Sequence, residues 1–267
     1  LHLENINMNT LQPFVNKRRS DGVKSRTINY SLQVLRRILN LACYEWLDEH
    51  NLSWLDKAPR IKLIPQTDRR ESNPLTPVEE RKLLDALPEH LRIMARFTVN
   101  TGCRDQEVCG LKWSYEVEVP EIGRSVVIIP VPRVKDSDDK LLILNDTAWS
   151  IVQAQRGKHE EWVFTYEGRR LGRLGVSSWY RALRRAGLND IRPHDLRHTF
   201  GARLRAAGVS LEDRQDLLGH NSNRVTTHYS RPDLEKLVHA ANSVNEDSRK
   251  IHALVILKKK PLRAVNV

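Results

Sequence analysis

The chain has 267 residues, of which 40% are apolar and 29% charged, a composition that excludes a disordered protein and fits a soluble globular one. Lysine and arginine outnumber aspartate and glutamate by 44 to 33, which gives a net charge of +11 and a pI near 9.8. Such an excess is expected of a nucleic-acid binder, because phosphate neutralisation supplies most non-specific affinity, although a merely basic enzyme fits the charge equally well.

The cysteines and the apolar runs exclude two further classes. Three cysteines without a CxxC pair disfavour a disulfide framework or a structural zinc site and favour a reducing compartment. No apolar run approaches the roughly 20 residues of a membrane span, so no membrane partner is expected. The sequence opens at Leu1 without an initiator methionine and is expected to be a fragment, which leaves a targeting signal or further N-terminal module open.

Residues 1–57 are predicted to form a helical domain. From Thr27 to Trp46 apolar residues recur at helical spacing on one face, and basic residues cluster beside that face. The cluster is either a solvated surface or a face that lies along DNA phosphates. The DNA-binding hypothesis includes Lys17, Arg18, Arg19, Lys24, Arg26, Arg36 and Arg37.

Residues 58–73 lose this periodicity and combine two prolines with several basic side chains. This composition indicates a basic interdomain linker that crosses a groove of bound DNA. Arg69 and Arg70 are its candidate DNA contacts.

A larger domain is predicted over 74–267, and its fold class is mainly α with a small antiparallel β-sheet. Thr76, Pro77 and Glu79 have the pattern of a helix start. Two β-rich runs, 125–131 and 141–144, are expected to pair as a hairpin with Lys135 near its tip. A strand-like run, 253–257, lies in the basic tail. Helices are expected over about 77–87, 91–100, 104–111, 146–155, 176–186, 194–207 and 210–219, with a last one from Pro232.

A spaced set of polar residues suggests the chemistry. Arg104, His194, Arg197 and His220 are followed by Tyr229. Arginines grip phosphate oxygens in a bidentate fork, imidazoles donate or move protons, and a phenol can act as nucleophile. Together these groups suit attack on a phosphodiester without a metal.

Each residue of the set also has an ordinary structural reading. The spacing His194-x-x-x-His198 matches a zinc-binding helix, but Asp195 stands where that motif needs glutamate and Arg197 adds a positive charge among the ligands. Arg104 is three residues from Glu107, as in a common helical salt bridge. Tyr229 would serve as a packed aromatic, and Lys135 as a solubilising hairpin residue with Lys140 as its rival. Their joint occurrence in this order favours a site.

The order and spacing resemble the tyrosine recombinase (phage integrase) family over roughly residues 10–240. The matching stretches are Thr-Gly-Cys-Arg-Asp-Gln-Glu-Val-Cys-Gly-Leu-Lys-Trp (101–113), His-Asp-Leu-Arg-His-Thr-Phe (194–200), Leu-Leu-Gly-His-Asn-Ser (217–222) and Thr-Thr-His-Tyr-Ser (226–230). Cys103 departs from the larger apolar residue usual there, and the N-terminal part is shorter than the family's four-helix core-binding domain. The catalytic set that the resemblance implies is Arg104, Lys135, His194, Arg197, His220 and Tyr229, with Glu107 as the residue that orients it.

The resemblance further implies site-specific strand exchange on double-stranded DNA in a prokaryotic cytoplasm, without metal, ATP or another cofactor. Tyr229 would form a 3′-phosphotyrosyl link, Lys135 would protonate the 5′-oxygen, and the histidines would donate or move protons. The family works as a homotetramer, with accessory DNA-bending or directionality factors possible, and the 253–257 run would pack on a neighbouring protomer.

Integration and excision of a phage or mobile element is the favoured activity. A chromosome-dimer resolvase of the same family and a type IB topoisomerase use a similar residue set and stay open as alternatives. A DNA-binding regulator with a decayed site and a zinc hydrolase are the remaining alternatives from other classes.

Overall fold

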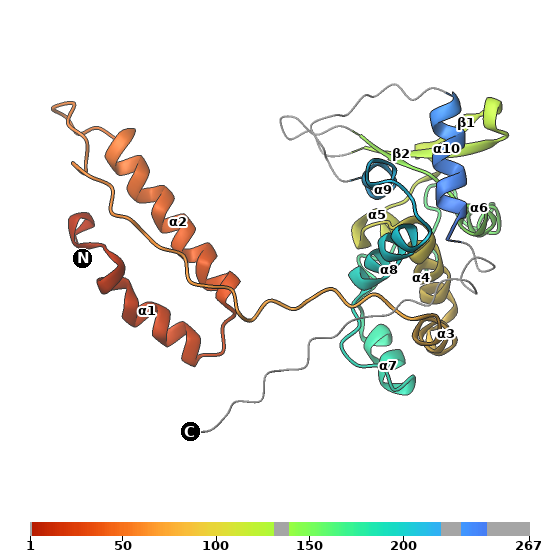
Figure 1. The fold of residues 1–267 in the computed structure, drawn as a ribbon, viewed down its shortest axis with the longest axis horizontal. Helices are drawn as coiled ribbons and strands as arrows, with labels where there is room; N and C mark the ends of the chain where they lie inside the picture. The colour runs from red at the N-terminus through yellow and green to blue at the C-terminus, as the bar shows by residue number, and fades with distance from the viewer. Residues whose placement is uncertain (1, 131–138, 220–230, 245–267) are drawn as a thin grey trace. The chain divides into compact units, whose positions relative to one another are not determined.

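The computed structural model describes residues 2–130, 139–219 and 231–244, apart from the side chains of 231 and 232. The chain forms two compact units, Leu1–Glu71 and Ser72–Val267, and each is described by itself (Figure 1). The predicted fold class is confirmed, since the described residues are mostly helical with a small antiparallel sheet.

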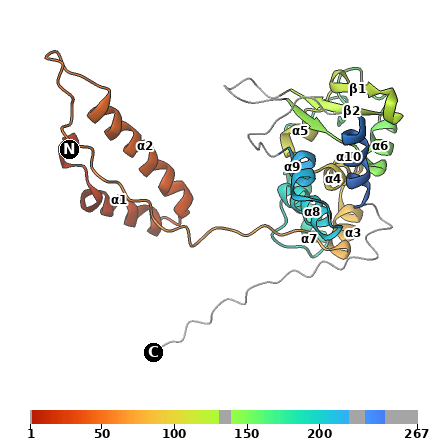
Figure 2. The same cartoon turned by 45° about the horizontal axis from the view of Figure 1, so that its top comes forward.

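The first unit is a pair of helices, α1 (Met8–Ser20) and α2 (Ser25–Tyr44), which follow the short 3-10 turn η1 (Leu3–Asn5). Both views show the two helices side by side (Figure 1, Figure 2). Asn7 caps α1 by accepting hydrogen bonds from the backbone N–H groups of Asn9 and Thr10. The apolar spacing that predicted the second helix reflects its buried face, which includes Ile28, Leu32, Leu39 and Ala42.

Residues 58–71 contain no helix or strand and belong to the first unit. The buried amide of Asn29 donates to the Ile64 carbonyl and accepts from the Ile64 N–H, both at 2.9 Å. The backbone N–H of Ser25 donates to Asp68 at 2.7 Å. This basic stretch is therefore fastened along α2 as far as Asp68.

The second unit has α4 (Glu89–Thr101) in its interior, with α8 (Pro193–Ala206) and α6 (Asp146–Gln153) packed against it. Figure 1 and Figure 2 both show the sheet at the opposite end of this unit from α3 and α7. The remaining helices are α3 (Pro77–Ala86), α5 (Asp105–Cys109), α7 (Ser177–Arg185), α9 (Leu211–Leu218) and α10 (Arg231–Asn242).

The sheet of the second unit has the order β1-β2-β3 and is antiparallel throughout the described residues. β2 (Arg124–Ile129) pairs with β3 (Lys140–Leu142) in the register Val127 with Leu142 and Ile129 with Lys140. This is the predicted hairpin, and β1 (Glu116–Val119) adds an edge strand that the sequence reading did not include. The strand-like run at 253–257 lies outside the described residues.

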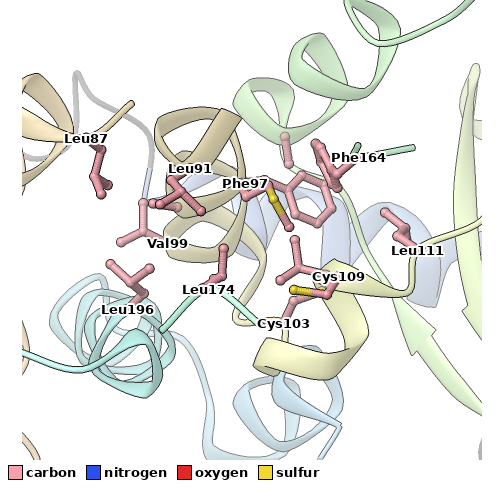
Figure 3. Close-up of a cluster of buried hydrophobic side chains, with 14 of the residues drawn as sticks. Leu87, Leu91, Phe97, Val99, Cys103, Cys109, Leu111, Phe164, Leu174 and Leu196 are labelled. Atoms are coloured by element: carbon pink, nitrogen blue, oxygen red, sulfur yellow. The ribbon is translucent and has the colours of Figure 1, made fainter. Parts of the chain in front are cut away.

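A large apolar cluster joins α4, α5, α8 and the segments after the sheet. Phe97 and Phe164 meet within it with ring centroids 5.0 Å apart. Cys103, which lies just before α5, and Cys109, the last residue of α5, also belong to the cluster (Figure 3). Cys103 is therefore a packing residue, as expected from its departure from the family pattern. The cluster therefore packs against both the turn before α5 and the helix itself.

Candidate active site

The turn between α4 and α5 places Arg104. α4 ends at Gly102, whose φ of +67° reverses the chain. A Cβ there would lie 2.7 Å from the Phe200 ring and 2.9 Å from the Leu218 side chain, so only glycine fits. The turn therefore packs against both α8 and α9 and brings Arg104 beside them.

Arg104 and Glu107 form the first pair of the site. Glu107 accepts from the Arg104 backbone N–H and from its guanidinium, each at 2.7 Å. The predicted contact between these residues is present, but α5 begins at Asp105 rather than at the predicted position 104, so Arg104 is the N-cap of the helix. The Arg104 side chain is 49% exposed whereas that of Glu107 is 13% exposed. The ion pair therefore joins a half-exposed guanidinium to a mostly buried carboxylate.

Lys140, the first residue of β3, is also part of this cluster. Its Nζ lies 2.6 Å from the second carboxylate oxygen of Glu107, and its side chain is only 4% exposed. Sequence reasoning treated Lys140 only as the rival of Lys135. A lysine at the start of a strand has no local pattern that reveals burial, so this member of the site was missed.

The start of α8 supplies the second arginine. Pro193 occupies its first position, and the buried Asp195 accepts from the Arg192 backbone N–H at 2.8 Å, which fixes the helix start. Arg197, one turn later, is almost wholly buried and donates at 2.6 Å to the carbonyls of Gly102 and Leu218. Its position is thus fixed by the backbone of two other elements.

His194 is exposed at the same helix end and meets His198 edge to face, with ring centroids 4.6 Å apart. Although the residue is largely open to solvent, partial burial of its ring lowers the pKa of His194, and the charges of Arg197 and Arg104 lower it further against the opposing effect of Asp195. The ring is therefore neutral at neutral pH, able to accept one proton and donate another. Burial and the charge of Arg104 likewise lower the pKa of the Arg197 guanidinium, which still stays charged.

The C-terminal end of α9 closes the described part of the site. The helix ends at Gly219, with φ +58°. Arg104 donates to the Gly219 carbonyl at 3.3 Å, while Arg197 donates to the Leu218 carbonyl. The two guanidiniums are therefore neighbours, which meet at adjacent carbonyls of one helix end.

The structure thus brings together four of the predicted residues: Arg104, Glu107, His194 and Arg197. Lys135, His220 and Tyr229 lie outside the described residues. Their flanks belong to this region in sequence, because His220 directly follows Gly219 and the 131–138 segment ends just before Asp139 and Lys140. The roles assigned to all seven residues stay predictions.

The nine predicted DNA-binding residues all lie in the first unit. Lys17, Arg18 and Arg19 form the last turn of α1, and Lys24 and Arg26 flank the start of α2, so these five cations gather at the turn between the helices. Arg36 donates to the Ile61 carbonyl and lines a groove of about 550 Å³. The remaining three are Arg37, Arg69 and Arg70.

The described part of the chain holds no group of three or more histidine, cysteine, aspartate or glutamate side chains placed to bind a metal ion. Within those same residues, no helix is both long and apolar enough to span a membrane.

The fold and the paired arginines define a helical protein with a cationic site suited to a phosphodiester. Residues 73–236 match the Phage integrase family. The integrase of Salmonella phage P22 is 30% identical over 259 residues, which cover 92% of this chain and 62% of that protein. The tyrosine recombinase XerA of Thermococcus kodakarensis is 26% identical over 242 residues, covering 87% of this chain and 80% of the relative.

Solved structures share the fold at lower identity. A lambda integrase dimer bound to a COC' core site has a TM-score of 0.60 and 21% identity, covering 96% of this chain and 69% of that one. The Tn1549 transposon integrase with circular intermediate DNA has a TM-score of 0.63 and 16% identity, covering 93% and 85%. The chain belongs to the phage integrase family of tyrosine recombinases, which confirms the resemblance stated from its motifs.

Proposed function

We propose that the chain is a site-specific recombinase that integrates and excises a phage or mobile element through a 3′-phosphotyrosyl intermediate. The observation that carries the proposal is the meeting of Arg104 and Arg197 at adjacent carbonyls of α9, directly before His220. Two neighbouring guanidiniums can hold both non-bridging oxygens of a scissile phosphate and stabilise the charge that develops on them.

The cleavage step assigns one task to each group. The Tyr229 phenol attacks phosphorus, its proton passes to a neighbouring imidazole or water, and the bond from phosphorus to the 5′-oxygen breaks. Lys135 gives a proton to that oxygen, so a free 5′-hydroxyl leaves. Because one phosphodiester replaces another, the reverse attack by a 5′-hydroxyl rejoins strands without ATP or metal. The neutral His194 donates a hydrogen bond or moves the proton.

The proposed partners are double-stranded recombination sites, bound by a homotetramer in a prokaryotic cytoplasm, with accessory DNA-bending or directionality factors. The lambda and Tn1549 integrases that share this fold are DNA complexes, and the basic excess of this chain suits the same ligand. The proposed division is a helical core-type DNA-binding domain over 1–57, a linker over 58–73 and a catalytic domain over 74–267.

A suicide-substrate assay tests the chemistry. Nicked duplexes from a random-sequence library are incubated with the protein in chelator, and covalent adducts are isolated under denaturing conditions and sequenced. We expect adducts with a 3′-phosphotyrosine from the wild type and none from Tyr229→Phe. Wild-type protein that captures no DNA, or a Tyr229→Phe protein that still does, contradicts the proposal.

A chromosome-dimer resolvase is the second candidate, favoured by the XerA and XerC tyrosine recombinases among the relatives, such as the 28% identical XerC of Bacillus licheniformis. Captured sites decide between the two. Two different partner sequences indicate integration, whereas a single near-palindromic site indicates resolution. Relaxation of supercoils without any recombinant product would instead indicate a type IB topoisomerase.

A further inference from the structure

Lys140 carries a buried positive charge to which the proposed cleavage step gives no task. Its side chain is 4% exposed, and its Nζ lies 2.6 Å from Glu107 Oε2. A buried ammonium is retained only when it is paired. Glu107 in turn uses its other oxygen, Oε1, to hold the Arg104 guanidinium at 2.7 Å. One carboxylate therefore links the buried lysine to the exposed arginine.

The aliphatic stem of Lys140 touches a second part of the site. A Cβ on Gly219 would stand 2.7 Å from Lys140 Cε, 2.8 Å from Cδ and 2.9 Å from Cγ. The stem therefore fills the space beside Gly219, which ends α9 and directly precedes His220. The carbonyl of the same glycine accepts a hydrogen bond from Arg104. Lys140 thus contacts α5 through its charge and the end of α9 through its methylenes.

We propose that Lys140 is a positioning residue for strand cleavage, which fixes Arg104 through Glu107 and supports the turn at Gly219. The inference rests on the proposed function and adds a residue to it. Lys140 does not touch the phosphate or the 5′-oxygen in this scheme, because its ammonium is turned into the protein and bound to Glu107. Lys135 keeps the task of protonating the leaving oxygen.

The electrostatics around Glu107 agree with this role. Burial raises the pKa of the Glu107 carboxyl, but the charge of Lys140, together with hydrogen bonds from Lys140 and Arg104, outweighs burial and lowers it overall. In the part of the chain that the structure describes, Arg197 on α8 and the thiol of Cys103 also interact with it. Without Lys140, Glu107 would still be buried but would lose its strongest partner, so the pKa of its carboxyl would rise. A protonated Glu107 would bind the Arg104 guanidinium less tightly.

Single-turnover cleavage of a suicide duplex at saturating DNA tests the inference. We expect Lys140→Met to lower the cleavage rate at least tenfold with less than a threefold change in DNA affinity, and to move the acidic limb of the pH profile to higher pH. Lys140→Arg should recover part of the rate. Lys82→Met, which removes an exposed lysine from α3, is the charge-matched control and should behave like the wild type.

Two further variants separate positioning from other roles. Lys140→Met combined with Glu107→Gln should be no slower than the slower single variant, because both changes break one linkage. A substrate with sulfur in place of the scissile 5′-oxygen releases a thiolate that needs no proton. It should rescue Lys135→Ala but not Lys140→Met.

Rescue of Lys140→Met by the sulfur substrate would overturn the inference, since Lys140 would then be the proton donor. An unchanged rate, a loss of affinity alone, or additive effects with Glu107→Gln would also overturn it. Thermal unfolding of each variant checks folding, and Lys140→Arg keeps the test valid if the methionine variant unfolds. If the wild type captures no DNA covalently, the proposed function itself is rejected. If the wild type cleaves and the Lys140→Met variant cleaves equally well, only the inference about Lys140 is rejected.

Discussion

Two separate constraints require glycine at position 219, and their effects on stability can be measured independently. Its φ of +58° disfavours any side chain, and its missing Cβ leaves room for the Lys140 stem. Gly208 has φ +77° with nothing within 4 Å of its missing Cβ, so it has the first constraint without the second. Gly208→Ala should destabilise by about 1 to 2 kcal/mol, the usual cost of the left-handed conformation.

Gly219→Ala should lose clearly more stability than Gly208→Ala, and cleavage by it should slow. Urea unfolding and suicide-substrate cleavage of both variants provide the measurement. Equal losses of unfolding free energy in the two variants would show that Lys140 yields to the added methyl group.

His194 predicts a pH dependence of stability. Its pKa is lowered on folding, chiefly by burial and then by Arg197, so the unfolded chain binds the proton more tightly. Folding stability should therefore rise with pH from the folded pKa up to about 6.5, the unperturbed value, and be lower in acid. His194→Gln should flatten this part of the profile in urea unfolding between pH 5 and 7.5. His239→Gln, at an exposed position on α10, is the control, and an identical slope in His194→Gln and the wild type would refute the assignment.

At the same scale, local patterns predicted the residues that carry a motif but not those that complete the site. Both pairs, Arg104 with Glu107 and His194 with Arg197, are spaced three apart. The structure places His194 and Arg197 on α8 as expected, whereas Arg104 is the N-cap of α5 and lies just before the helix. Lys140 contacts Glu107 across 33 positions of sequence, and the carbonyl contacts of Arg197 cross three elements. Such contacts depend on tertiary packing, which residue spacing does not report.

At the scale of elements, α3 and α8 are joined by a buried ion pair. Arg203 donates to Glu80, and the two side chains are 6% and 3% exposed. Arg203→Met removes the charged partner that Glu80 has on α8 and should cost about 3 to 5 kcal/mol of unfolding free energy. The double change Glu80→Leu with Arg203→Met should cost less than this single one. As a control, Lys236→Ala breaks the more exposed pair with Asp213 and should cost about 0 to 1 kcal/mol. Denaturant unfolding of all three variants provides the measurement. Equal losses of unfolding free energy in the three would contradict this account of the buried pair.

Element boundaries followed the capping chemistry closely. Thr76 and Glu79 form the predicted capping box before α3, and Gly102 and Gly219 end α4 and α9 as expected. β1 was not predicted, although Glu-Val-Glu-Val alternates as a strand does, because four residues are too short to distinguish from a loop. The packing of residues 61–68 along α2 was also not predicted. Two of the hydrogen bonds that connect them come from the buried side chain of Asn29, and no sequence pattern indicates such a contact.

For the whole molecule, the basic excess predicts salt-dependent DNA binding. Replacing Lys17, Arg18 and Arg19 by alanine should reduce the slope of log affinity against log salt by roughly 2 to 3, since each neutralised phosphate contributes about 0.9. The loss should be similar for specific and random duplexes, because phosphate contacts carry no sequence information. Replacing the exposed Arg81, Lys82 and Lys158 of the second unit removes the same charge and should change the slope less. Equal changes of the slope in the two triple variants would show that only the overall charge of the protein matters, and not the position of these three residues.

All three cysteines are buried. Burial raises the pKa of the Cys103 thiol to about 11 and, together with Asp105, that of Cys109 to about 12, and a protonated, covered thiol reacts slowly with maleimides. A cysteine introduced at an exposed site in each unit, such as Lys57→Cys and Lys82→Cys, would therefore be the preferred position for a fluorophore without prior removal of the native thiols. Energy transfer between such a donor and acceptor, measured with and without a DNA duplex, would report the distance between the two labelled positions in each state.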